Sequence, residues 1–162
     1  EEIMAGTLKV KIQEDIILDN QDYGSKRVLE ISGVNDIIKR IVTVPASTDT
    51  TVLMFTSTTG VVDGALDIEL VKYIRVTNLD SSNSVNLSLQ IDAGEDDSAA
   101  DNTAGLLLEA GKSFMMGTPS DGIAVEDDAA TLITDGTFKN LESIIIDSGT
   151  NAVQVEVFVA SA

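Results

Sequence analysis

The sequence contains no cysteine, no histidine and no tryptophan among its 162 residues. Without cysteine no disulfide can form, and without histidine the chain can build neither a Ser-His-Asp triad nor a histidine-ligated zinc site. Carboxylates, lysine and tyrosine are the acid–base groups that are left. We therefore expect a protein that is not an enzyme and that needs no cofactor.

Basic residues are also scarce, with 10 lysines and arginines against 27 aspartates and glutamates, for a net charge of −17. This balance argues against direct binding of nucleic acid or of anionic membranes, because both require a basic surface. The charge is uneven: residues 1–75 hold eight of the basic residues and a net charge of −4, whereas residues 76–162 have a net charge of −13. We predict that the less acidic N-terminal part faces a partner, while the C-terminal loops face solvent.

Long hydrophobic runs are missing, and no stretch of 18 apolar residues could form a membrane-spanning helix. Apolar residues nevertheless make up 43% of the chain, which is typical of a globular protein. A chain of 162 residues is long enough for one well-buried domain. We expect residues 1–162 to form a single domain in which residues 1–6, which show no periodicity, are an N-terminal arm.

The clearest pattern runs from Leu70 to Ile91 and predicts two β-strands around a polar turn, that is, a hairpin. Asn78, Asp80 and Asn83 are among the turn-forming residues between the two strands. Apolar residues alternate with polar ones, as in strands with one buried face. The predicted buried residues are Ile74, Val76, Val85, Leu87, Leu89 and Ile91.

Similar short patterns recur along the whole chain at intervals of roughly 8 to 15 residues, with no helix of ordinary length. We expect further hairpins at residues 106–116 and 141–159, and single strands near residues 8–12, 27–31, 37–44 and 51–56. About ten short strands with glycines between them predict an all-β protein. The expected architecture is a β-sandwich with a Greek-key or jelly-roll-like path.

Two acidic loops are candidates for calcium binding, because calcium prefers six to eight oxygen ligands. They are residues 92–101 and 126–128, and neither has the ligand spacing of a dedicated calcium loop. We favour solvated loops and assign no metal ligand. Paired carboxylates are also compatible with glycoside hydrolysis, but with 27 acidic residues such pairs arise by chance.

Two small basic pairs are candidates for contacting an acidic partner. Lys9 and Lys11 fall on one face of a predicted strand, and Lys39 and Arg40 are adjacent in another. For each pair taken alone, an ordinary solvated strand face is the favoured interpretation. We assign these four residues as candidate partner-binding residues.

The segment from Tyr73 to Leu89, read as Tyr-Ile-Arg-Val-Thr-Asn-Leu-Asp-Ser-Ser-Asn-Ser-Val-Asn-Leu-Ser-Leu, resembles a stretch of small structural proteins of tailed bacteriophages. In those proteins a strand of the form hydrophobic-Arg-hydrophobic-Thr/Gln-Asn leads into a polar turn and a second strand. The upstream Ile38–Pro45 segment and the downstream Gly111–Phe114 segment are similar as well, so the resemblance spans residues 35–120.

This resemblance implies a virion protein, and we expect a capsid decoration (cement) protein that binds the outer surface of the major capsid shell. Such a protein is expected to be a homo-oligomer, and a trimer would suit a site where three capsomers meet. A neck or tail component is an alternative. A carbohydrate-binding β-sandwich is a further alternative, against which the aromatic content of 4% counts.

Overall fold

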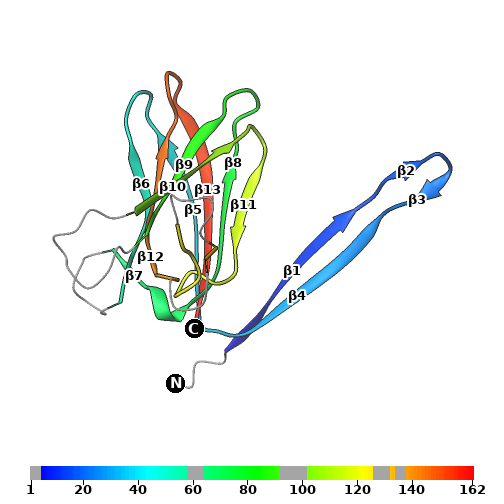
Figure 1. Ribbon diagram of the computed structural model, residues 1–162, viewed down its shortest axis with the longest axis horizontal. Coiled ribbons are helices and arrows are strands. Elements are labelled where there is room, and N and C mark those ends of the chain that lie inside the picture. Colours follow the sequence, from blue (N-terminus) through cyan, green and yellow to red (C-terminus); the bar gives the residue numbers. More distant parts are fainter. Residues whose placement is uncertain (1–4, 58–63, 92–101, 126–131, 134–137) are drawn as a thin grey trace.

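Strands dominate the computed structural model, which describes residues 5–57, 64–91, 102–125, 132–133 and 138–162. Thirteen strands lie in these described residues: nine form an all-β sandwich, and the other four form a long ribbon that projects from it (Figure 1). The predicted all-β sandwich is therefore confirmed, with more strands than the ten or so expected. The single helical element of the described residues is a 3₁₀ turn at Ile68–Leu70.

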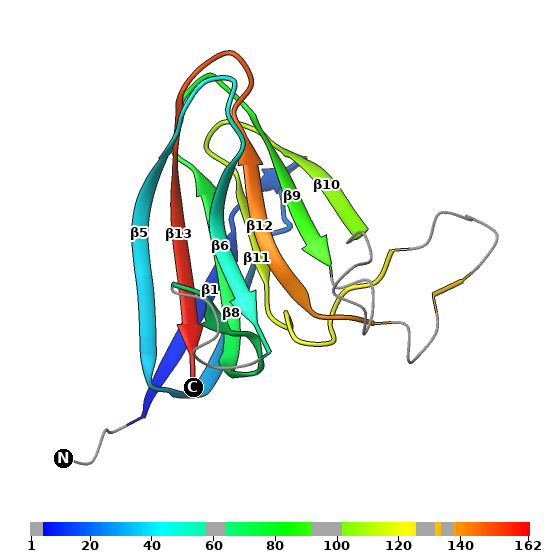
Figure 2. The same ribbon diagram turned by 90° about the vertical axis from the view of Figure 1, so that its left-hand side faces the viewer.

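Two antiparallel sheets face each other in the sandwich (Figure 2). In spatial order, the four-stranded sheet contains β11 (Ser113–Met116), β8 (Val71–Asn78), β13 (Val153–Ser161) and β5 (Asp36–Val44). The five-stranded sheet contains β10 (Asn102–Leu108), β9 (Val85–Ile91), β12 (Leu141–Asp147), β6 (Thr50–Thr56) and the short β7 (Leu66–Asp67), which pairs in parallel with β6.

The strand order is that of a jelly roll. Among the eight long strands of the sandwich, only the connection from β9 to β10 stays within one sheet, and every other connection crosses to the opposite sheet. Two Greek keys wound in this way give the double-sheet arrangement found in viral capsid domains, lectins and cupins. The chain therefore follows the jelly-roll alternative of the predicted path.

The core lies between the two sheets and is built from the alternating apolar residues of facing strands. All six residues predicted as buried in β8 and β9 are at most 5% exposed. The inward-facing residues of β13 are at most 1% exposed: Val153, Val155, Val157 and Val159. The period-two patterns thus identified the inner face of these strands correctly.

The predicted hairpin at residues 70–91 is wrong, because its two strands do not pair with each other. β8 pairs with β11 and β13 in one sheet, whereas β9 pairs with β10 and β12 in the other. The predicted hairpins at residues 106–116 and 141–159 fail in the same way, since β10 and β11, and likewise β12 and β13, lie in opposite sheets. The polar connections span the roughly 10 Å between packed sheets rather than turning within one sheet.

A buried asparagine forms hydrogen bonds at the end of the sandwich where β8 ends. Asn78 is fully buried at the end of β8, and its Nδ2 donates to the carbonyl oxygens of Asn83 at 2.8 Å and Leu108 at 3.1 Å. Its Oδ1 accepts from the amide of Asp80 at 2.9 Å. One side chain thereby links the β8–β9 connection to the end of β10.

The projecting ribbon, residues 6–34, is a long β-hairpin. Its strands β1 (Gly6–Glu14) and β4 (Ser25–Val34) pair antiparallel throughout, and β2 (Ile17–Leu18) and β3 (Gln21–Asp22) continue the pairing to the far end. We call this ribbon the arm. Most of the arm predicted at residues 1–6 lies outside the described residues, and the projecting element that the structure describes is the longer ribbon that follows.

A tight turn closes the far end of the arm. Asp19 and Asn20 have φ values of 50° and 63°, the left-handed conformation at both central positions that a two-residue type I′ hairpin turn requires. Asparagine and aspartate adopt this conformation more readily than other non-glycine residues. The sequence Asp-Asn therefore determines where the arm turns back.

Candidate functional site

The arm is anchored to the outer face of the four-stranded sheet by a small apolar cluster separate from the main core. Val34, Tyr73 and Ala160 are its buried members. Leu8, Val10, Ile31 and Phe158 pack against them. The amide of Asn35 also donates to the carbonyl of Ser161 at 2.9 Å, which ties the root of the arm to β13.

The alternation along the arm explains why it docks here. Cross-strand pairs place Leu8 with Ile31 and Val10 with Leu29 on one face, whereas Lys9 with Glu30 falls on the other. The apolar face meets the sheet near the root. Farther out the arm leaves the sheet, so Ile12 and Leu29 on the same face remain about half exposed.

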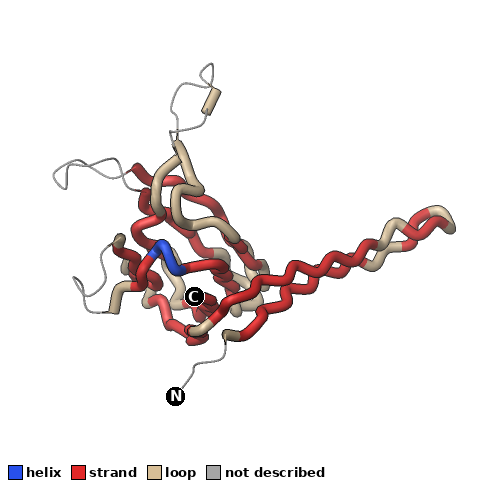
Figure 3. The backbone as a smooth tube through the Cα atoms, turned by 90° about the horizontal axis from the view of Figure 1, so that it is seen from below, coloured by secondary structure: helices blue, strands red, loops and turns tan. Residues whose placement is uncertain are grey.

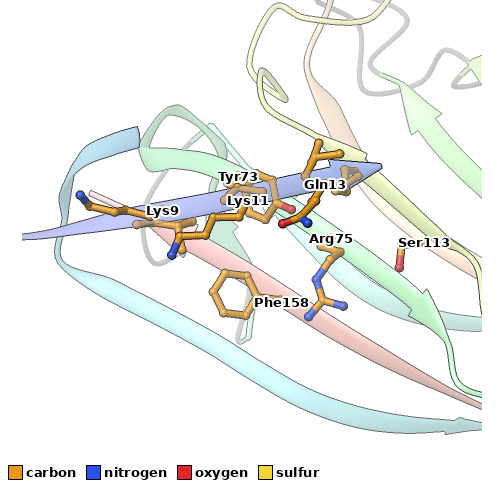
Figure 4. Close-up of a pocket in the computed structure, with 11 residues that line it drawn as sticks. Lys9, Lys11, Gln13, Tyr73, Arg75, Ser113 and Phe158 are labelled. Atoms are coloured by element: carbon orange, nitrogen blue, oxygen red, sulfur yellow. The ribbon is translucent and has the colours of Figure 1, made fainter. Parts of the chain in front are cut away.

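A groove opens where the arm separates from the sheet, and we call it the arm–sheet groove. It consists of two adjoining hollows of about 510 and 350 Å³, which share Val10, Ile12, Tyr73 and Met115. Figure 4 shows the larger hollow, with Lys11 and Gln13 contributed by β1 and with Arg75 and Phe158 contributed by the sheet. The groove therefore lies between two elements that are far apart in the sequence.

The floor of the groove carries an organised set of aromatic and charged groups. The rings of Tyr73 and Phe158 are in an edge-to-face arrangement with centroids 6.1 Å apart, and the guanidinium of Arg75 lies 5.8 Å from the centroid of Phe158. Arg75 Nη2 also lies 2.5 Å from Glu156 Oε1, and Lys39 Nζ lies 3.4 Å from Glu156 Oε2. Arg75 is thus fixed in place beneath the arm.

These contacts shift the pKa values of two floor residues. Hydrogen bonding from Arg75 holds the pKa of the Glu156 carboxyl below its usual range, with burial acting in the opposite direction and Lys39 adding to the lowering. Burial raises the pKa of the Tyr73 phenol, and the nearby positive charge of Arg75 opposes this increase. Both groups therefore keep their ordinary charge at neutral pH, with Glu156 ionised and Tyr73 neutral.

The four candidate partner-binding residues have different surroundings. Lys9 forms an exposed ion pair with Glu30 at 2.7 Å, and both Lys9 and Lys11 line the arm–sheet groove. Lys39 pairs with Glu156, and Arg40 donates from Nη2 to the carbonyl of Val52 at 2.5 Å, which links β5 to β6. A partner-binding role for these residues remains a prediction, and the structure brings only Lys9 and Lys11 together at the groove.

The far end of the arm is unusually apolar for an exposed element. Ile16, Ile17, Leu18 and Tyr23 are 52%, 76%, 58% and 59% exposed. A two-stranded ribbon has no core of its own and is marginally stable in water without a packing partner. Such a cluster on a projecting element is typical of a contact surface with another molecule.

Sequence reasoning predicted the two main strands of the arm, near residues 8–12 and 27–31, but missed the exposed apolar tip and the sheet side of the groove. The tip had a detectable signal, because Asp19-Asn20 separates two stretches of similar length that both contain alternating apolar residues. The sheet side of the groove had no such signal in the sequence. Tyr73, Met115 and Phe158 come together only because β8, β11 and β13 are neighbours in one sheet and the arm folds over them.

The two acidic loops considered for calcium, residues 92–101 and 126–128, lie outside the described residues. Within the described ranges, no group of three or more aspartates and glutamates is placed to hold a metal ion. The described part of the chain also contains no helix long and apolar enough to cross a membrane.

Comparison with known proteins found no similar protein. No protein-family model, no curated protein and no solved structure matches the chain.

Proposed function

We propose that this chain is a structural, non-enzymatic component of a bacteriophage virion, acting as a capsid decoration protein on the outer surface of the major capsid shell. The observation that carries the proposal is a jelly-roll sandwich that bears a projecting ribbon with an exposed apolar tip. Jelly rolls are a recurrent architecture of viral capsid domains, and a ribbon without a core of its own is suited to contacts between subunits.

The sequence resemblance to phage structural proteins is consistent with the same role, and its residues have structural tasks in the sandwich. Arg75 lies against Phe158 and pairs with Glu156, while Asn78 links two connections. The motif therefore supports the proposal through the fold and does not identify a binding site. The net charge of −17 would keep the free protein soluble before assembly.

A decoration protein of this kind stabilises a shell by mass action, because it binds the assembled shell and not its separated subunits. At a free concentration 100 times the dissociation constant, the stabilisation is about 2.7 kcal/mol for each occupied site. Particles that carry the protein are expected to withstand heating better than particles that lack it.

The proposal is tested by counting copies in purified particles of the virus that encodes the chain, relative to the major capsid protein. Hundreds of copies per particle, together with a lower disruption temperature after deletion of the gene, are the expected result. A few copies per particle would favour a neck or tail component and would overturn the decoration role.

Absence of the chain from the particle would overturn a virion role altogether. A carbohydrate-binding module would then be the next candidate, because lectins share the jelly-roll architecture. Within the described ranges, Tyr23 and Phe138 are the aromatic side chains exposed enough to stack on a sugar. A glycan array would test that alternative.

A further inference from the structure

Two surfaces of this chain are complementary to each other but do not meet within one molecule. One is the arm tip, residues 14–23, and the other is the arm–sheet groove at the root of the same arm. Figure 3 shows the arm extending away from the sandwich, with the turn at its far end. Strands advance about 3.3 Å per residue, so the five-residue step from Ile12 to Ile17 places the tip about 16 Å beyond the groove.

The tip combines apolar and acidic groups. Ile16, Ile17 and Leu18 are more than half exposed. The segment from residue 14 to residue 23 contains four carboxylates and no lysine or arginine: Glu14, Asp15, Asp19 and Asp22.

The groove combines apolar and basic groups. The chain has 27 acidic and only 10 basic residues, yet every charged residue that lines the groove is basic. These residues are Lys9, Lys11, Arg27 and Arg75. Within the described part of the chain, Lys11 and Arg27 form no ion pair, so one unpaired positive charge lies at each of the two hollows. Phe158, Tyr73 and Met115 supply apolar surface between these charges.

We propose that the arm tip of one copy of this chain occupies the arm–sheet groove of a second copy. The apolar tip side chains would cover the half-exposed apolar face of the neighbouring arm, while Glu14 and Asp15 approach Lys11 and Arg27. The contact uses different surfaces on the two molecules, so repeating it produces a closed ring when the rotation permits. The trimer expected from the sequence is one such ring.

This contact extends the proposed function by specifying how copies are joined, and it does not depend on the capsid role. It is therefore tested on the purified full chain in the absence of any virus particle. Failure to find the protein in virions would leave the contact intact, and a monomeric chain would leave the capsid role intact.

The first experiment measures oligomeric mass by sedimentation over a range of protein concentrations. The unmodified chain is expected to associate, and Ile17→Ser is expected to weaken association by about tenfold or more, because it removes most of the apolar surface that one isoleucine buries. Ile41→Ser is the matched control, since Ile41 is 60% exposed on β5 and does not line the groove. Circular dichroism and thermal unfolding establish that both variants fold.

The second experiment reverses the charges. Lys11→Glu in one chain, and Glu14→Lys with Asp15→Lys in another, should each reduce self-association about tenfold or more, whereas a mixture of the two chains should associate. A monomeric unmodified chain, equal effects of Ile17→Ser and Ile41→Ser, or a mixture no more associated than its components would each overturn the proposal.

Discussion

Asn78 links neighbouring segments of the chain at the end of the sandwich where β8 ends. It is fully buried, and its side chain forms three hydrogen bonds, to the carbonyls of Asn83 and Leu108 and from the amide of Asp80. A buried polar group of this kind is costly to leave without a partner. The side chain joins the connection between β8 and β9 to the end of β10.

Replacing Asn78 by alanine is expected to lower the free energy of unfolding by about 2–4 kcal/mol, because buried carbonyl groups would lose their donor. Asn86→Ala, an exposed position on β9, is the control and should change stability by less than about 0.5 kcal/mol. Urea unfolding of both variants measures the difference. Similar midpoints for the two variants would contradict the role assigned to Asn78.

Asp80 organises the same connection through its carboxylate. Its Oδ1 accepts from the amides of Ser82 and Asn83, both at 2.7 Å. These bonds favour the ionised form, so the backbone amide of Asn83, followed by that of Ser82, lowers the pKa of Asp80 below its usual range.

A depressed pKa makes the stability contribution of Asp80 depend on pH. The contribution is complete above the pKa of the unfolded chain, near pH 4, and is lost as the pH falls through the lower pKa of the folded protein. The stability advantage of the unmodified chain over Asp80→Asn should therefore shrink as the pH falls below about 4. Urea unfolding at a series of pH values measures this difference, and subtraction removes the titration shared by both chains. A difference that grows on acidification would refute the assignment.

The position at which the arm folds back on itself is determined by its turn residues. The left-handed conformation of Asp19 and Asn20 costs little for these two residues but about 1–2 kcal/mol for most others. Gly24 is constrained for a different reason, since a Cβ atom there would lie 2.7 Å from the carbonyl oxygen of Glu14. The far end of the arm therefore tolerates few substitutions in its backbone positions, although its side chains are exposed.

Asn20→Val is expected to open the far end of the arm, whereas Asn20→Gly should preserve it. The amide of Tyr23, which donates to the carbonyl of Ile16 at 3.0 Å, is a direct probe. Its hydrogen exchange should accelerate in Asn20→Val and stay unchanged in Asn20→Gly, with amides of β12 and β13 unaffected in both. Equal protection of Tyr23 in the two variants would show that the turn residues do not control the arm.

The sequence predicted the fold class and the inner faces of the strands, because the alternation of residues such as Val85 and Leu87 depends only on which face is buried. It could not predict strand partners. A short polar stretch such as residues 79–84 looks the same whether it turns within a sheet or crosses between sheets, and in a jelly roll almost every connection crosses. The groove was unpredictable for the same reason, since it depends on which strands are neighbours.

As a whole, the described part of the molecule is a sandwich with one projecting ribbon. The main core is enclosed between the sheets, and several exposed apolar side chains, among them Ile16, Ile17 and Leu18, lie on the arm. The net charge of −17 opposes association in general, so a specific contact needs local charge complementarity such as that between tip and groove. The proposed contact between tip and groove would join copies of the chain through the arm.

The absence of native cysteine allows a direct test of this claim. Chains carrying Ile17→Cys are mixed with chains carrying Met115→Cys, oxidised mildly and analysed by mass spectrometry, with Ile17→Cys and Ile41→Cys chains as the control mixture. A disulfide needs Cα atoms within about 7 Å, so it reports close approach. We predict a disulfide between position 17 of one chain and position 115 of the other, well above the yield of the control mixture. Equal yields in the two mixtures would contradict the proposed contact between tip and groove.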